Sequence, residues 1–190
     1  DNSSEKESGL QEIIESAKDM EYYPLTENQL GIYYECKQNP DVIKYTMPTT
    51  VKFGSDVDAN KLKQAIVDTI EAHPYLKTRI VNTDDGKIMQ KRCDDAKIEE
   101  IEIVEIDAIT NREIMKNDIK AIPLDNNQLF RFKIYKTPEE TILFSDFHHI
   151  ITDGVSQDNF FHDLTKAYNN EKIETEKIDG FVYSLIENET

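Results

Sequence analysis

The chain has 190 residues and is strongly acidic, because 22 lysines and arginines against 38 aspartates and glutamates leave a formal net charge of −16. This length fits one domain or a large piece of one, and a hydrophobic content of 38% is enough for a core. The charge argues against a nucleic-acid partner, since phosphate contacts need clustered lysine and arginine. No apolar run is long enough to span a membrane, and residues 1–7 do not resemble a signal peptide. We therefore expect a soluble, cytoplasmic α/β domain without membrane contact.

Residues 1–20 are polar and acidic, with a few apolar side chains spaced for one or two helical turns. They predict a linker or a loosely docked helix, and the domain itself is expected to occupy residues 21–190. Thr26 can cap a helix that continues through Tyr34 and stops before Pro40.

The next elements are a strand and an amphipathic helix. Residues 43–53 alternate and are rich in β-forming side chains, which predicts a strand that ends at Gly54. Asp58 can cap a helix that His73 and Pro74 close. The apolar residues of that helix have helical spacing: Leu62, Ala65, Ile66 and Ile70.

The remainder of the chain is predicted to hold two hairpins, a half-exposed strand, two helices and a short or frayed C-terminal helix. In chain order these are 75–81 with 87–92, 98–106, 111–119, 129–135 with 141–147, 155–168, and the tail from residue 178. This succession predicts a layered α/β domain with a mixed β-sheet packed with helices. No Gly-rich turn follows a strand, which argues against dinucleotide-binding and P-loop nucleotide folds.

Two adjacent histidines, His148 and His149, stand at the end of a predicted strand and directly before a predicted helix. Strand ends are where α/β sheets usually place reactive groups. Adjacent side chains on a strand point to opposite faces, so one imidazole can face a cavity while the other faces the packed side. A histidine can act as a general base toward a hydroxyl, a thiol or an amine. The pair therefore predicts one chemical and one supporting imidazole, although a hydrogen-bonded core histidine is the alternative.

Asp153 and Gly154 follow within the same stretch. Asp153 could orient the loop or pair with a cation elsewhere. Gly154 suits a positive φ or a close backbone approach. The helix that begins here could direct its N-terminal N–H groups at an anion or a polarised oxygen.

A metal site is not expected. Adjacent histidines on a strand diverge and rarely share one ion, His162 would have to swing in, and no acidic ligand cluster is placed to help. His73 and His162 are expected to be structural. Cys36 and Cys93 form no CxxC pair, so neither a disulfide framework nor a thiolate zinc site is indicated.

Three stretches together resemble a known family. Residues 148–154, His-His-Ile-Ile-Thr-Asp-Gly, resemble the HHxxxDG motif of nonribosomal peptide synthetase condensation domains. Residues 23–33 are similar to the first condensation motif, with its PL(S/T)xxQ opening and helix. Residues 73–79 resemble the second motif, although Ala72 and Pro74 stand where the family usually has arginine and glutamate.

The resemblance implies a chloramphenicol-acetyltransferase-like fold. Condensation domains are V-shaped pairs of such lobes and are about twice as long as this chain. Residues 21–190 would then form the N-terminal lobe, one half of the pseudo-dimer, and the C-terminal lobe would be absent from this chain. The isolated lobe is expected to be inactive, because the family's active site lies in a channel between the lobes.

The resemblance also implies a reaction and its partners. Upstream and downstream peptidyl carrier domains deliver substrates on phosphopantetheine arms, an acceptor amine attacks the donor thioester, and a peptide bond forms. His149 matches the catalytic histidine, His148 the supporting one, and Asp153 with Gly154 the structural end of the motif. The parent chain would also contain an adenylation domain and make an antibiotic or another secondary metabolite. No cofactor or metal is expected to bind directly.

Other readings stay open. Epimerisation-type domains share the double-histidine motif, and other acyltransferases use a single-histidine HxxxD version on small molecules. A third reading is a non-catalytic lobe that only docks a carrier protein, against which the intact His148, His149 and Asp153 argue. The cyclising variety replaces both histidines by aspartate, so this sequence does not match it.

Overall fold

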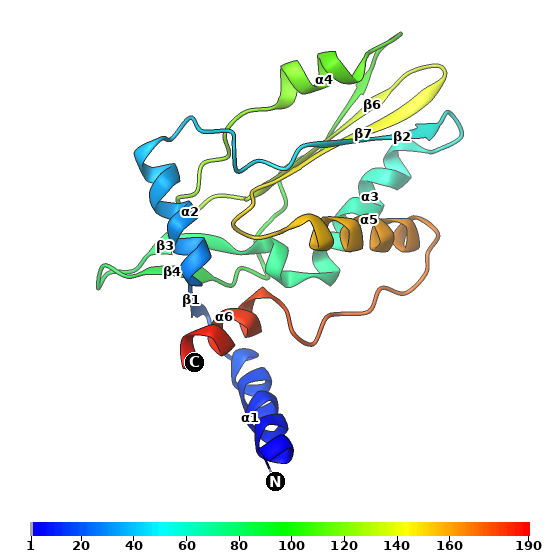
Figure 1. Cartoon of the computed structure of the whole chain (residues 1–190). Coiled ribbons are helices and arrows are strands. Elements are labelled where there is room, and N and C mark those ends of the chain that lie inside the picture. The colour runs from blue at the N-terminus through cyan, green and yellow to red at the C-terminus, as the bar shows by residue number, and fades with distance from the viewer. Residues whose placement is uncertain (1) are drawn as a thin grey trace.

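The computed structural model describes residues 2–190 and contains two separate sheets with helices around them (Figure 1). The elements follow in the order α1 (Asn2–Ala17), β1 (Tyr22–Pro24), α2 (Glu27–Gln38), β2 (Thr49–Gly54), α3 (Ala59–Ala72), a 3₁₀ turn (Pro74–Lys77), β3 (Arg79–Asn82), β4 (Ile88–Lys91), β5 (Glu102–Glu105), α4 (Asn111–Asp118), β6 (Phe130–Lys136), β7 (Glu140–Phe147), α5 (Gly154–Tyr168) and α6 (Gly180–Glu189).

The larger sheet has the strand order β2-β7-β6-β5 and is mixed. Strand β7 pairs antiparallel with both β2 and β6, whereas β5 pairs parallel with β6. The smaller sheet, β1-β4-β3, is antiparallel throughout. The predicted α/β class with a mixed sheet and both predicted hairpins are therefore confirmed.

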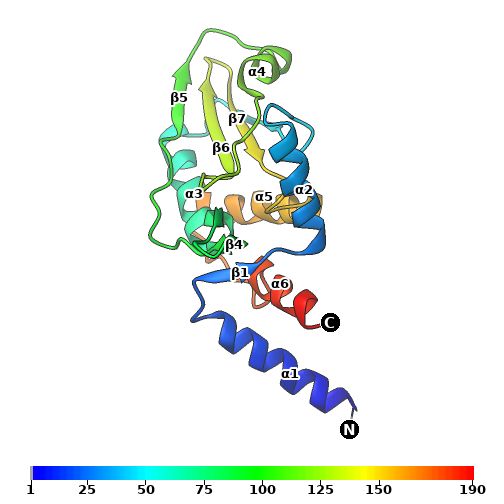
Figure 2. The ribbon, with the colours of Figure 1, turned by 90° about the vertical axis from the view of Figure 1, so that its left-hand side faces the viewer.

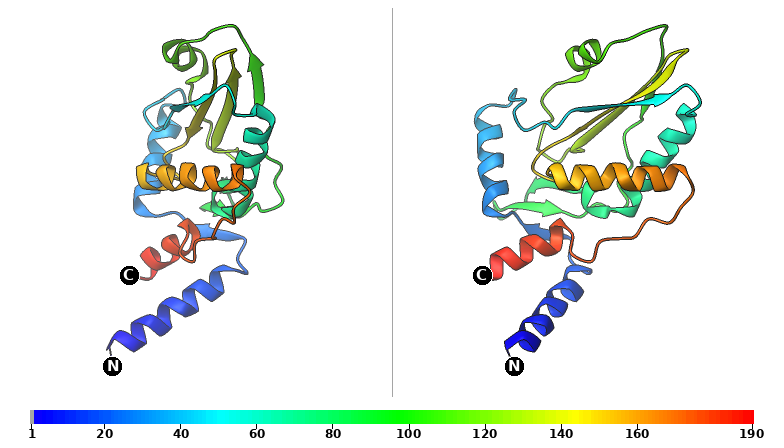
Figure 3. Two further views of the ribbon diagram at one scale, coloured as in Figure 1. Left: turned by 90° about the vertical axis from the view of Figure 1, so that its right-hand side faces the viewer. Right: turned by 45° about the vertical axis from the view of Figure 1, so that its right-hand side comes forward.

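Strand β7 is buried on both of its faces. Leu143 and Phe147 belong to a cluster with side chains of α3 and α5, whereas Ile142 and Phe144 belong to a second cluster with Ile114 of α4. The ribbon shows the same layers, with α4 on one side of the sheet and α3 and α5 on the other (Figures 1 and 3). The middle of the strand, residues 142–144, is a continuous apolar run, as expected for a strand covered on both faces, whereas Thr141, Ser145 and Asp146 are buried polar residues.

A third cluster joins α2, the small sheet and the segment that follows β7. Its buried members are Leu25, Ile32, Tyr33, Ile80, Ile122, Leu124, Leu129, Ile150 and Ile151. Ile150 and Ile151 are therefore packed on α2, and this packing fixes the chain directly after the two adjacent histidines.

Helix α1 contacts the rest of the chain through its C-terminal end. Ala17 is buried with Tyr23, Phe181 and Val182, and the rings of Tyr23 and Phe181 stack at a centroid distance of 4.3 Å. The remainder of α1 extends away below α6 (Figure 2). The helix has 16 residues, so it is longer than the one or two predicted turns.

Three predicted strands are shorter than expected, and the one predicted over 98–106 covers only Glu102–Glu105. The strand predicted over 43–53 begins only at Thr49, because the backbone N–H of Thr46 turns back to the carbonyl of Ile43 at 3.0 Å and Pro48 lacks an N–H for pairing. The strand predicted over 75–81 begins at Arg79, because a 3₁₀ turn starts at Pro74. The three-residue strand β1 was not predicted.

Candidate active site at the end of strand β7

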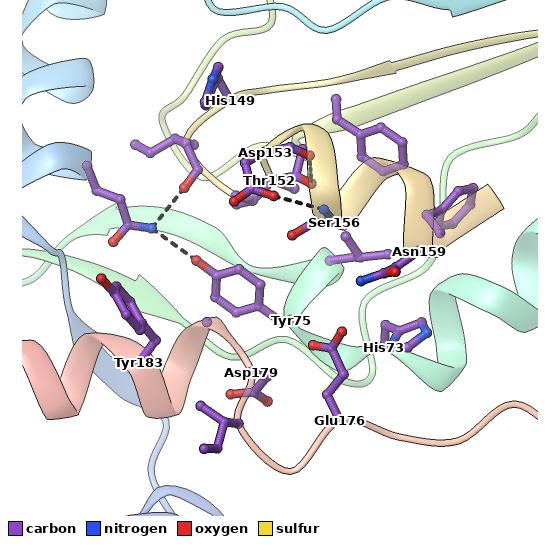
Figure 4. A pocket seen from close by; sticks show the side chains of 18 of the residues that line it. His73, Tyr75, His149, Thr152, Asp153, Ser156, Asn159, Glu176, Asp179 and Tyr183 are labelled. Atoms are coloured by element: carbon purple, nitrogen blue, oxygen red, sulfur yellow. Dashed lines mark hydrogen bonds between the residues drawn. The ribbon is translucent and has the colours of Figure 1, made fainter. Parts of the chain in front are cut away.

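The two adjacent histidines have opposite environments. The backbone N–H of His148 donates to the carbonyl of Leu129 at 2.8 Å, and that of His149 donates to the carbonyl of Tyr45 at 2.7 Å. The His148 side chain is only 2% exposed, whereas that of His149 is exposed and borders a cavity of about 400 Å³ (Figure 4). This alternation continues that of β7, so the backbone decides which imidazole can be reached from outside.

His148 is held as a neutral imidazole. Its Nδ1 accepts a hydrogen bond from the backbone N–H of Ile150 at 3.0 Å, and its Nε2 lies 3.8 Å from the thiol sulfur of Cys36. Burial, with a smaller contribution from the nearby His149, lowers the pKa of His148 to about 4. The Nδ1 atom therefore carries a lone pair at neutral pH, and His148 acts here as a hydrogen-bond acceptor for its own loop.

Asp153 caps helix α5. Its carboxylate accepts a hydrogen bond from the backbone N–H of Ser156 at 2.8 Å, and hydrogen bonding with Ser156 lowers the pKa of this carboxyl. This hydrogen bond orients the loop at the start of α5.

Gly154 is the first residue of α5. Its φ is not positive, and no heavy atom lies within 4 Å of the place where a Cβ would be. Both expectations for this glycine, a left-handed conformation and a close approach by its surroundings, are therefore wrong within this chain.

The cavity lies between α5 and the segment that leads into α6. His73 and Asp163 form one wall, where the His73 Nε2 is 2.7 Å from a carboxylate oxygen of Asp163 and ties the end of α3 to α5. Glu176 and Asp179 lie across the cavity from His149 (Figure 4). Its wall contains four carboxylates and neither lysine nor arginine among the described residues, so the cavity disfavours anions.

Several residues of the cavity wall were not singled out as site residues by the sequence. Gln29 and Tyr75 line it, as does Tyr183 of α6. Gln29 follows Thr26 at the capping-box spacing, and Tyr75 lies in the second family-like stretch, so both carried a local signal. Tyr183 carried none, because it reaches the site only through the packing of α6.

His162 and the cysteines lie outside this cavity. His162 is exposed on α5, and both cysteines are free thiols. Within residues 2–190, no group of three or more histidine, cysteine or acidic side chains could hold a metal ion, and no helix has the length and apolar character to cross a bilayer.

Known proteins match nearly the whole chain. A family model described as Condensation domain matches residues 19–186. Bacitracin synthase 3 of Bacillus licheniformis is 31% identical over 156 residues, which are 82% of this chain and 2% of that protein. Bacitracin synthase 2 of the same organism is 28% identical over 181 residues, which are 95% of this chain and 7% of that protein. The chain thus spans only a small part of the synthases that it matches.

Solved structures share the fold. The starter condensation domain of rhizomide synthetase RzmA superimposes with a TM-score of 0.74 at 18% identity, covering 90% of this chain and 43% of that one. The first condensation domain of the CDA synthetase gives a TM-score of 0.68 at 16% identity, covering 81% and 42%. These likenesses confirm the fold that the motifs implied, and the chain spans about two fifths of those domains.

Proposed function

The chain belongs to the condensation-domain family, and from this premise we propose that residues 21–190 form the N-terminal lobe of a domain that makes amide bonds between carrier-tethered substrates. The single observation that carries the proposal is the exposed imidazole of His149 at the border of the cavity. The shared fold and the coverage of about two fifths of solved condensation domains support a one-lobe assignment. The active unit would need the second lobe.

In the proposed reaction, an amine nitrogen attacks the carbonyl carbon of a thioester. The carbon–sulfur bond breaks, the nitrogen loses a proton, and the sulfur leaves as a thiol after gaining one. His149 would hold the amine by a hydrogen bond and accept its proton, and proton transfer of this kind contributes ~10²–10⁴-fold to the rate. Holding the amine beside the thioester contributes through positioning as well.

The other motif residues have supporting roles in this proposal. His148 would accept the Ile150 N–H and so hold the loop, and Asp153 would fix the start of α5. The carboxylates around the cavity favour an amine over an anionic acceptor.

The substrates and partners follow from the family and are part of the proposal. Donor and acceptor would arrive as thioesters on the phosphopantetheine arms of an upstream and a downstream carrier domain, with an adenylation domain in the same synthetase. The reaction would take place in the cytoplasm. The chain itself would bind no resident cofactor.

The test is His149→Ala in the synthetase that contains this chain together with its second lobe. We expect dipeptide formation to fall by at least ~10²-fold while loading of both carriers is unchanged. His162→Ala is the matched control, because His162 is exposed on α5 but does not line the cavity. Undiminished dipeptide formation in His149→Ala would refute the proposed role.

The same assay separates the alternatives. An epimerisation-type domain would exchange the α-proton of a single tethered substrate without joining two. A lobe that only docks a carrier would bind it equally well with and without the His149 imidazole, and no product would depend on that imidazole.

A further inference from the structure

We propose that Gln29 is a positioning residue for His149, because its side-chain amide holds the carbonyl of Ile150, the residue that follows His149 in the loop. The inference concerns the geometry of the loop and can be measured without any reaction. Only its kinetic consequence rests on the proposed function.

The Gln29 side chain is itself fixed at the start of α2. Its Oε1 accepts a hydrogen bond from the backbone N–H of Thr26 at 2.9 Å, and the Thr26 hydroxyl accepts one from the Gln29 N–H at 3.2 Å. This reciprocal capping box leaves the amide nitrogen of Gln29 pointing away from the helix end. That nitrogen lies 2.8 Å from the carbonyl oxygen of Ile150.

A buried polar network surrounds this contact. The Gln29 Nε2 also lies 3.0 Å from the Tyr75 hydroxyl and 3.1 Å from the Oε1 of Gln90 (the bond with Tyr75 is drawn in Figure 4). The Tyr75 hydroxyl donates to the same Gln90 oxygen at 2.8 Å, and the Gln90 Nε2 donates to the carbonyl of Pro24 at 2.9 Å. Gln29 is 7% exposed and Gln90 is fully buried, so a donor lost here is not replaced by bulk water.

Four hydrogen bonds hold the backbone of residues 149–151. The His149 N–H donates to Tyr45, and the Ile150 N–H donates to Nδ1 of His148. The third bond, from Gln29 to the Ile150 carbonyl, is the one that comes from α2 on the cavity side. Without it, the buried Ile150 carbonyl loses its donor, and the Ile150–Ile151 peptide is held only by the fourth bond, from the Ile151 N–H to the His148 carbonyl at 3.2 Å.

The effect on catalysis is expected to be large for a residue that does not touch the reacting atoms. A displacement of about 1 Å in a catalytic group can cost on the order of 10²-fold in rate. Loss of Gln29 should therefore lower kcat while KM for the carrier substrates changes little, because Gln29 is buried and contributes almost nothing to the outer surface.

Two variants test the contact. Gln29→Glu keeps the shape of the side chain but replaces the donor amide by a carboxylate oxygen. Gln29→Met removes the hydrogen bonds altogether, and it serves as the test if the buried carboxylate of Gln29→Glu prevents folding. Gln11→Glu is the matched control, since Gln11 is exposed on α1. Ile114→Val, in the cluster under α4 on the far face of the sheet, controls for a general loss of stability.

The first readout is structural and uses the chain alone. The sequence has 4 histidines, so the imidazole resonances can be resolved by NMR, and amide exchange can be followed at His149 and Ile150. We expect the His149 imidazole resonances to shift and these amides to exchange at least ~10-fold faster in both Gln29 variants, but not in the controls. Unchanged resonances and exchange in a folded Gln29 variant would overturn the proposal.

The second readout is kcat for dipeptide formation in the complete domain, where both Gln29 variants should lose ~10–10²-fold with KM nearly constant. An equal loss in Ile114→Val would assign the effect to stability and overturn the positioning role. If His149→Ala retains full activity while the Gln29 variants still change the His149 resonances, the proposed function fails and the positioning inference stands.

Discussion

Mild acid is expected to destabilise the chain through His148. This imidazole is 2% exposed, and burial together with the neighbouring His149 lowers its pKa from 6.5 to about 4. Its Nδ1 accepts the N–H of Ile150, and a proton on Nδ1 abolishes that bond. Protonation therefore removes a hydrogen bond and places a charge in a buried site at the same time.

The sign and size of the effect follow from the two pKa values. The unfolded imidazole takes up a proton near pH 6.5, whereas the folded one does so only near pH 4, so the unfolded state binds protons first as the pH falls. The stabilisation is therefore complete above the unfolded pKa and is lost on the way to the folded one. The free energy of unfolding should fall by about 2 kcal/mol between about pH 7.5 and about pH 5, and by about 3 kcal/mol in full.

Urea unfolding at a series of pH values measures this loss. His148→Gln removes the titrating group, so its free energy of unfolding should depend less steeply on pH over this range. Carboxylates that titrate in the same range act equally in both proteins and cancel in the difference. His162→Gln removes an exposed imidazole from α5 and is the matched control. Parallel pH profiles for the unsubstituted chain and His148→Gln would refute the reasoning.

Two further predictions concern local packing and capping. A Cβ on Gly180 would lie 2.1 Å from the Tyr75 ring, so Gly180→Ala should displace α6, lower the free energy of unfolding by about 1–3 kcal/mol and speed amide exchange in α6. The control is Gly31→Ala on α2, where the added Cβ meets open space, and it should raise the free energy of unfolding by ~0.5–1 kcal/mol. Unchanged exchange in α6 would contradict the first expectation. Asp153→Ala should lose about 1 kcal/mol in urea unfolding, whereas Asp153→Asn should lose little, because asparagine also accepts from the Ser156 N–H. Equal losses in the two Asp153 variants would argue against capping.

The sequence predicts well where the determinants are local. Thr26 and Asp58 cap the helices that follow them, and the antiparallel pair β6–β7 turns between the predicted strands 129–135 and 141–147. Each of these features depends on neighbours a few residues away, which a sequence displays directly.

The sequence predicts poorly where distant segments meet. The bond from Gln29 to Ile150 joins residues 121 positions apart, and no local pattern announces it. Likewise, Gly180 contacts Tyr75 only because the segment after α5 runs back below the small sheet before α6 begins (Figure 1). His149, which the sequence singles out, borders the candidate cavity, but the other residues of its wall come from segments far apart in the chain.

The geometry also bears on which histidine could serve as the base. A base has to reach the amine and keep a lone pair free for the proton. His148 does neither, because it is buried, and its Nδ1 already accepts the Ile150 N–H. Its Nε2 faces Cys36, so neither ring nitrogen is directed at the cavity. His149 is the next residue and therefore points to the opposite face of the strand. Its imidazole borders the cavity, where a substrate could contact it.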